Sequence, residues 1–306
     1  MSDLVTIIVD GLTRVPKSLP PRVLYDERGS RLFEQITELP EYYPTEAERA
    51  LLTASASSIA RTTGVRTLVE LGAGVLDKSR ILLDAGIDNG TLERYVPVDI
   101  SSEVLVESAD RVQQLYPSLL IAPLEADFIA TMQLPELQPP SVVSFLGGTI
   151  GNLLPDERVT FYSRMADAAG AGGFLLVGTD LVKDLDRIVQ AYFDRAGVTE
   201  AFLLNVIDVI NSECGTDLQR EDFDYVPLWD AREQRMDLRL RARRRLDFPL
   251  PGMSAPCTIE KDEEIRIEVS AKFTLAQVRA EMESAGVRVV EQYENGDFAL
   301  TLAACG

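Results

Sequence analysis

Residues 66–100 read RTLVELGAGVLDKSRILLDAGIDNGTLERYVPVDI, and this stretch decides the fold. An apolar segment at 66–74 ends in glycines, a helical pattern follows over 78–87, and a second apolar segment, YVPVDI, occupies 95–100. The same alternation continues with a helix over 101–117, strands over 119–128 and 141–152, a helix over 157–170 and a strand over 172–180. Short buried strands that alternate with helices predict a parallel, doubly wound α/β sheet.

The pattern changes after about residue 183. A largely helical stretch, 185–215, is followed by two segments of period-two alternation, a helix and a hairpin around Asn295-Gly296, which indicate a mixed α+β unit. Residues 1–46 contain several prolines and predict short helices and ordered loops, followed by a helix from about residue 46. We therefore expect two domains, residues 47–182 with the parallel sheet, and residues 1–46 plus 183–306 as the α+β unit.

Composition narrows the classes of function. The chain of 306 residues has a formal net charge of −19, which disfavours nucleic acid and anionic membrane as partners. It contains no histidine, so a catalytic triad and a histidine-ligated metal site are excluded, and we expect no metal. Three cysteines without metal or disulfide spacing, no apolar run long enough to cross a bilayer and no signal peptide predict a cytoplasmic protein.

The glycine turn at Gly72-Ala73-Gly74 follows the first predicted strand, where a bare backbone lets a nucleotide-like ligand approach closely. A turn that merely packs tightly is an equally good reading of two glycines alone. The third glycine of a dinucleotide fingerprint is missing, because Val75, Leu76 and Asp77 follow. This absence disfavours an NAD-dependent oxidoreductase and favours an adenosylmethionine-type site.

Acids stand at the ends of the next two predicted strands. Asp99 can accept hydrogen bonds from ribose hydroxyls, although a helix N-cap is an equal alternative because Ser101 and Ser102 follow. Asp127 can accept a hydrogen bond from an adenine amino group, and Phe128 can cover the adenine ring. A strand-end acid beside a core phenylalanine is an equal alternative. Three such positions at three consecutive strand ends favour a nucleotide-like ligand.

Three further motifs can form an amino-acid pocket. Asn152 ends the turn GGTIGN after the fourth strand and can orient an amine or carboxylate, or serve the turn itself. Tyr42 lies in the stiff loop LPEYYP, which can cover a small polar substrate or simply pack on the surface. Glu268 and Ser270 share one face of a predicted strand, where they can read an imidazole or an ammonium group, or form a solvated face.

Together these motifs resemble the histidine-specific Nα-methyltransferases of ergothioneine biosynthesis, over nearly the whole chain. The markers, in chain order, are PKSLPP, LYDERGSRLFEQIT, LPEYYP, TLVELGAG, FLGGTIGNL, GTDLVKD, AYFDRAGVTEAF, LRARRR and EVSAKF. The resemblance implies a class I, Rossmann-like methyltransferase sheet with a separate substrate-binding domain. It also implies S-adenosylmethionine (SAM) as cofactor, threefold methylation of the histidine α-amine to hercynine, and a monomer.

The resemblance also assigns roles to individual residues. The cofactor contacts it implies are Gly72, Lys78, Asp99, Asp127 and Phe128. The amino-acid pocket it implies consists of Tyr42, Asn152, Tyr192, Leu238, Glu268 and Ser270, with Tyr25 as a further phenol near the amine. Glu and Ser would read the imidazole, whereas Asn and Tyr would hold the amine and carboxylate. With no histidine as base, we expect Tyr25, Tyr42 and Asn152 to handle the amine, and water or a phenol to receive its proton.

The chain departs from the family pattern at Leu238, where such enzymes usually have Met. The swap nearly conserves volume but alters the wall near the imidazole, which leaves the choice of amino acid open. The alternatives are an Nα-methyltransferase of tryptophan, another aromatic amino acid or a histidine derivative. A non-catalytic SAM-binding protein is a remote alternative.

Overall fold

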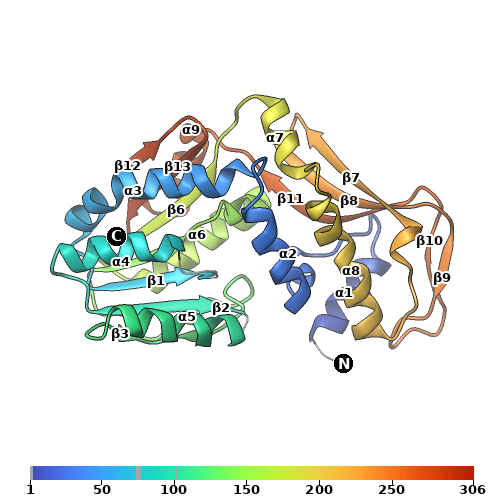
Figure 1. Cartoon of the computed structure of the whole chain (residues 1–306), viewed down its shortest axis with the longest axis horizontal. Helices are drawn as coiled ribbons and strands as arrows, with labels where there is room; N and C mark the ends of the chain where they lie inside the picture. The colour runs from blue at the N-terminus through green and yellow to red at the C-terminus, as the bar shows by residue number, and fades with distance from the viewer. Residues whose placement is uncertain (1–2, 74–76, 101) are drawn as a thin grey trace. The chain divides into compact units, whose positions relative to one another are not determined.

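A computed structural model describes residues 3–73, 77–100 and 102–306, and the chain forms two compact units (Figure 1). Unit 1 consists of Met1–Tyr43 and Lys183–Ala271, and unit 2 consists of Pro44–Val182 and Lys272–Gly306. The crossovers after Tyr43 and Val182 fall close to the boundaries expected after residues 46 and 182, but a third crossover, after Ala271, was not expected.

Unit 2 contains the predicted parallel sheet. Its strands are β1 (Thr67–Leu71), β2 (Arg94–Asp99), β3 (Leu120–Ile121), β4 (Leu124–Glu125), β5 (Ser141–Phe145), β6 (Phe174–Asp180), β12 (Arg288–Glu294) and β13 (Phe298–Ala304). The order is β12-β13-β6-β5-β1-β2-β3, with β4 also paired to β2. Strands β1, β2, β5 and β6 run parallel, which confirms the doubly wound α/β class. The strand order reverses between β1 and β5, and ligands of such sheets bind at this switch point.

Helices cover both faces of this sheet (Figure 1). They are α3 (Tyr43–Thr63), α4 (Asp77–Asp88), α5 (Ser102–Leu115), α6 (Pro155–Ala169) and α9 (Leu275–Ser284). Leu52 of α3, Leu83 of α4 and Val112 of α5 belong to one buried cluster with Val142 of β5. Phe145 points to the opposite face because side chains alternate along a strand, and there it packs on Phe161 of α6.

The last 35 residues correct the predicted domain division, which assigned them to the α+β unit. Strands β12 and β13 form the expected hairpin, but β13 pairs antiparallel with β6 along its whole length and extends the main sheet of unit 2. Phe298, Leu300 and Leu302 are fully buried there. Their backbone groups obtain partners from β6, a choice that the alternation pattern of a hairpin does not specify.

The predicted third strand, 119–128, is also different in the structure. It forms two short pieces, β3 and β4, which both pair with β2. Pro123 lies between them and has no backbone N–H to donate to the neighbouring strand. Asp127 and Phe128 consequently lie on the segment after β4 and not at the end of a continuous strand.

Unit 1 is the expected mixed α+β unit. Its helices are α1 (Asp3–Thr13), η1 (Pro21–Leu24), α2 (Glu27–Thr37), α7 (Leu185–Tyr192), α8 (Val198–Cys214) and η3 (Arg220–Asp222). Its strands are β7 (Phe223–Asp230), β8 (Arg235–Ala242), β9 (Leu246–Phe248), β10 (Cys257–Ile259) and β11 (Glu264–Ala271). Strands β7, β8 and β11 form an antiparallel sheet in the order β11-β8-β7, and α8 packs against α1, α2, β7 and β8.

No helix in the described part of the chain is both long enough and apolar enough to cross a membrane.

Candidate functional site

The glycine turn after β1 lies against the aromatic residue that follows β4. Gly72 has a left-handed φ of 70°, and its amide donates to the Val98 carbonyl at 2.8 Å. A Cβ placed on Gly72 would lie 3.6 Å from Cζ of Phe128. The structure therefore brings two of the predicted cofactor residues together at the carboxyl edge of the sheet, whereas Gly74 lies outside the described residues.

Phe128 is supported from behind by two other rings. Its centroid lies 5.8 Å from that of Phe145 and 6.4 Å from that of Phe161. These edge-on and tilted contacts fix the plane of the Phe128 ring, which remains only partly buried. The ring is thus an ordered apolar surface beside the glycine turn, and it can cover a flat ligand.

The two predicted cofactor acids lie on neighbouring segments. Asp99 ends β2, and its carbonyl accepts from the Ala126 amide at 3.0 Å, one residue before Asp127. The Asp127 carboxylate accepts from the Ala130 amide at 3.0 Å, and both acids are partly buried. The main-chain bond holds the two acids on adjacent segments at the same edge as Gly72.

The acid in the strand before the glycines has an internal role. Glu70 is buried, and the Tyr95 hydroxyl donates to it at 2.7 Å. Burial raises the pKa of Glu70, and the hydrogen bond from Tyr95 and the charge of Lys78 only partly oppose this increase. Glu70 therefore joins β1 to β2 from inside the sheet.

Lys78, another predicted cofactor residue, binds a carboxylate that sequence reasoning missed. Its Nζ donates at 2.7 Å to Oε2 of Glu48, which is fully buried on α3. Oε1 of Glu48 accepts from the Gly147 amide at 2.7 Å. Within the helical pattern over 46–60, Glu48 looks like any other polar residue, so its burial carried no local signal.

Asn152 ends the 3-10 helix η2 (Thr149–Asn152), which follows β5. Gly147 and Gly148, just before it, have φ values of 80° and 70°, so this segment turns sharply as the glycines indicate. Asn152 is partly buried and belongs to unit 2, whereas the other predicted amino-acid residues belong to unit 1.

In unit 1 the structure joins Tyr192 to Ser270. The Tyr192 hydroxyl donates to Oγ of Ser270 at 2.7 Å, and both side chains are buried. In the register of β11 on β8, Ser270 is opposite Met236 and Glu268 is opposite Leu238. The prediction that Glu268 and Ser270 share a strand face is therefore confirmed, and Leu238 lies on that face beside Glu268.

A β-bulge sets the direction of Glu268. The register of β11 on β8 shifts between Arg266 and Glu268. Before the shift, Arg266 is opposite Arg239 and lies on the charged face; after it, Glu268 lies on the buried face with Leu238. Without the bulge, period-two alternation would place Arg266 and Glu268 on the same face.

Tyr225 on β7 is a second residue that sequence reasoning missed. Its hydroxyl donates to the Tyr192 carbonyl at 2.8 Å, at the end of α7. Burial, and next the negative charge of Glu268, raise the pKa of Tyr225 well above its usual value, so the phenol stays protonated and keeps donating. Tyr225 thus connects the backbone of Tyr192 with the surroundings of Glu268.

The remaining predicted phenols lie elsewhere in unit 1. Tyr25 follows η1 and packs edge-on against Phe33 and Phe202, with ring centroids 5.7 and 5.6 Å away. Tyr42 is partly buried in the loop before α3, where its amide donates to the Leu39 carbonyl at 3.0 Å. Tyr25 thus belongs to an aromatic cluster of α2 and α8, and Tyr42 belongs to the stiff turn that its prolines indicate.

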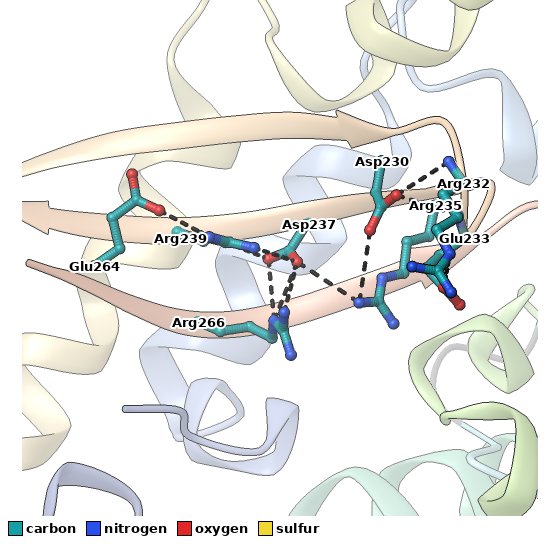
Figure 2. A network of polar contacts seen from close by, with 8 residues as sticks. All are labelled: Asp230, Arg232, Glu233, Arg235, Asp237, Arg239, Glu264 and Arg266. Carbon is teal, nitrogen blue, oxygen red and sulfur yellow. Dashed lines mark hydrogen bonds and ion pairs between the residues drawn. The ribbon is translucent and has the colours of Figure 1, made fainter. Parts of the chain in front are cut away.

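The charged face of the β11-β8-β7 sheet carries an ion-pair network (Figure 2). Asp237 is 1% exposed and accepts from Arg239 at 2.7 Å and from Arg266 at 3.1 Å. Burial by itself would raise the pKa of Asp237, but the hydrogen bonds from these arginines outweigh it and lower the pKa. The network braces the strands that carry Glu268 and Leu238 on the other face.

The chain is similar in sequence to known proteins over nearly its whole length. A family described as "Histidine-specific methyltransferase, SAM-dependent" matches residues 4–305. The histidine N-alpha-methyltransferase of Mycolicibacterium smegmatis is 43% identical, over 96% of this chain and 92% of that protein. The L-tryptophan methyltransferase of Psilocybe serbica is 27% identical, over 92% of this chain and 86% of that protein.

A longer relative shows the same similarity in one part of its length. Ergothioneine biosynthesis protein 1 of Neurospora crassa is 29% identical over 94% of this chain, but the match spans only 33% of that protein. The family match extends through both units. The similarity to the M. smegmatis protein also extends through both units, with 43% of the aligned residues identical. This chain belongs to the family of SAM-dependent, histidine-specific methyltransferases.

Proposed function

We propose that this SAM-dependent N-methyltransferase acts on the α-amino group of L-histidine and transfers three methyl groups in succession to give hercynine, a step of ergothioneine biosynthesis. The observation that carries the proposal is the group formed by Tyr192, Ser270 and Glu268 in unit 1. A carboxylate and a hydroxyl side by side match the two edges of an imidazole, which has one N–H donor and one acceptor nitrogen.

The residues at the carboxyl edge of unit 2 fit the cofactor. A bare Cα at Gly72 faces the Phe128 ring beside the topological switch point, where nucleotides bind in such sheets. We assign the ribose hydroxyls to Asp99, the adenine amino group to Asp127 and the adenine ring to Phe128. Gly72 and Lys78 complete the cofactor contacts. When bound, SAM supplies an electrophilic methyl group on a sulfonium sulfur.

The chain's own residues then have to orient the amine. Methyl transfer requires the nitrogen lone pair to be in line with the bond that breaks, so positioning is the main contribution of the protein. We assign the amine and carboxylate of the substrate to Asn152, Tyr42 and Tyr192, and place Tyr25 near the amine. Because the chain has no histidine, water or a phenol receives the amine proton.

Glu268 has the most specific role in this proposal. Its carboxylate accepts from the imidazole N–H, and Glu268→Ala would leave that donor unpaired at a cost of about 1–3 kcal/mol. We expect the KM for histidine to rise by roughly fivefold or more, since each 1.4 kcal/mol is a factor of ten in binding. Steady-state kinetics at saturating SAM measures this, and a smaller rise contradicts the imidazole role.

Tryptophan is the second candidate substrate, because one relative named for that activity is similar over most of this chain and because Leu238 replaces the usual Met. An indole has only a donor, so Ser270 would lose the partner that an imidazole nitrogen offers. Leucine and methionine are nearly equal in volume. For this reason, we expect Leu238→Met to change the KM for histidine by less than about threefold.

The identity of the substrate is tested by incubating the purified protein with SAM and an equimolar mixture of the twenty amino acids, followed by mass spectrometry. Histidine carrying three methyl groups is the expected product. Methylated tryptophan or tyrosine would show that the substrate is another aromatic amino acid and would assign the change in specificity to the pocket wall at Leu238. If the protein keeps its cofactor but methylates none of the amino acids, the result would favour a modified substrate, such as a histidine derivative, or a non-catalytic SAM-binding protein.

We further propose that the enzyme is a monomer in the cytoplasm and that it acts on a small molecule and not on nucleic acid. The net charge of −19 and the three free cysteines, Cys214, Cys257 and Cys305, support it. Light scattering at working concentration tests the oligomeric state.

A further inference from the structure

Glu48 is a fully buried carboxylate enclosed by three segments of unit 2. Oε2 accepts from Nζ of Lys78 in the first turn of α4 at 2.7 Å. Oε1 accepts from the amide of Gly147, after β5, at 2.7 Å. A Cβ on Gly178 of β6 would lie 2.2 Å from Oε1, so only glycine leaves room for the carboxylate there.

The two hydrogen-bond donors of Glu48 come from opposite sides of the switch point. Lys78 lies in the first turn of the helix after β1, and Gly147 lies in the turn after β5. These are the two connections that flank the crevice where the strand order reverses. A Cβ on Gly147 would lie 3.4 Å from Nζ of Lys78, so the two connections also approach each other closely.

Lys78 can serve both Glu48 and a ligand. A lysine ammonium has three N–H donors, and Glu48 accepts one of them. The side chain is 25% exposed, so its ammonium reaches the protein surface while it remains tied to the buried acid. The direction in which Lys78 presents its charge is therefore set by Glu48.

A second buried ion pair in unit 2 shows what a purely structural brace looks like. Arg158 of α6 is 3% exposed and pairs in bidentate fashion with Glu281 of α9, at 2.9 and 2.6 Å. Arg158 also donates to the Leu153 carbonyl and lies over the Phe273 ring. This pair joins two helices, whereas the Glu48 contacts join the two connections at the switch point.

We infer that Glu48 is a positioning residue of the cofactor site, which holds the Lys78 ammonium and the Gly147 turn in the arrangement that binds SAM. The inference rests on the part of the proposed function that assigns Lys78 to the cofactor. Glu48 acts through Lys78 and Gly147, so its loss weakens cofactor binding and leaves recognition of the amino acid unchanged.

Glu48→Gln tests the inference because the amide keeps an acceptor for the Gly147 N–H but removes the charge that holds Lys78. Isothermal titration should show the Kd for SAM rising by about tenfold, equivalent to about 1.4 kcal/mol. The KM for histidine, measured at saturating SAM, should stay within about twofold, which is less than 0.5 kcal/mol. Glu281→Gln is the matched control, and it should lower the Tm while leaving the Kd for SAM unchanged.

A double-mutant cycle with Lys78→Met shows whether Glu48 acts through Lys78. In the Lys78→Met background, adding Glu48→Gln should produce little further loss of SAM affinity, because coupled residues are not additive. Full additivity, or a Glu48→Gln variant that loses Tm like Glu281→Gln but keeps the wild-type Kd, overturns the inference. If Glu48→Gln does not fold, the same cycle is measured with Glu48→Asp, which keeps the charge but shortens its reach.

These experiments distinguish a failure of the role inferred for Glu48 from a failure of the proposed substrate. Wild-type protein that binds SAM but leaves histidine unmethylated would contradict the proposed substrate, while the titrations of the Glu48 variants would still decide the role of Glu48. Wild-type activity on histidine combined with an unchanged Kd in Glu48→Gln would contradict the inference alone.

Discussion

Gly72 meets two demands that a larger residue meets only with strain. Its φ of 70° lies in the left-handed region, where an L-residue costs about 1–2 kcal/mol. Its bare Cα also leaves the space in front of the Phe128 ring open. The first demand concerns folding and the second concerns the ligand, so the two effects can be separated by experiment.

Gly72→Ala should lower the Tm and weaken SAM binding, because the methyl group occupies space beside the ring at 3.6 Å. Gly215→Ala is the control, since Gly215 is also left-handed, with a φ of 68°, but has nothing within 4 Å of an added Cβ. It should lower the Tm to a similar extent and leave the Kd for SAM unchanged. Equal Kd values for the wild type and both variants would contradict the role of Gly72.

Tyr225 offers a second test at the residue scale. Tyr225→Phe removes only the hydroxyl that donates to the Tyr192 carbonyl at 2.8 Å. Such a bond contributes about 0.5–1.5 kcal/mol, so the KM for histidine should rise by roughly two- to tenfold. The Kd for SAM should not change, because Tyr225 lies in unit 1.

Tyr162→Phe is the control for Tyr225→Phe. The Tyr162 hydroxyl is buried in unit 2 without a hydrogen-bond partner among the described residues. Its removal should leave the KM for histidine unchanged and the Tm equal or slightly higher. A histidine KM that is the same in wild type and Tyr225→Phe would show that Tyr192 is held by other contacts.

At the scale of the element, a bulge in strand β11 places two nearby charged residues on opposite faces of the sheet. Arg266 joins the network around Asp237, whereas Glu268 faces Leu238. The network stabilises the strand from the charged side, so its effect on the pocket is indirect. The contribution of this ion-pair network to stability should depend on pH, because its central acid is Asp237.

Asp237→Asn should lower the Tm at pH 7, because Arg239 and Arg266 lose a buried negative partner. The pKa of Asp237 is lowered in the folded state, so its contribution is fully present above the unfolded pKa of about 3.9 and is lost as the pH falls through the folded value. The difference in Tm between wild type and variant should therefore shrink below about pH 4. A difference that stays constant from pH 7 to pH 3 would contradict this assignment.

The whole molecule has no histidine, which simplifies its pH dependence. Any titration of the rate between pH 5 and 8 then belongs to the substrate or to a perturbed group, since histidine is the side chain that ordinarily titrates there. We expect kcat/KM to rise with pH as the substrate amine loses its proton. The midpoint should move when histidine is replaced by its Nα,Nα-dimethyl form, because the amine itself differs.

A midpoint that is the same for both substrates would assign the titration to the enzyme. Glu70 is then the first residue to test, because burial raises its pKa. The readout would be the Kd for SAM as a function of pH without histidine present.

Much of this protein follows from local sequence. Short apolar runs and helical patterns predict the βα alternation of unit 2, and glycines and acids after successive strands indicate the cofactor edge, because parallel strands bring their carboxyl ends together. The shared face of Glu268 and Ser270 also follows from local period, and the register confirms it. Each of these conclusions depends on local patterns and on the general geometry of parallel sheets.

Other features were decided by tertiary structure. The pairing of β13 with β6, the burial of Glu48 beside Lys78 and Gly147, and the hydrogen bond from Tyr225 to Tyr192 join residues that are far apart in the chain. The bulge that turns Glu268 away from Arg266 depends on how β11 meets β8. Local pattern determines the kind of element and the face it buries, whereas the partner that satisfies each backbone group or buried charge is selected only when distant segments pack together.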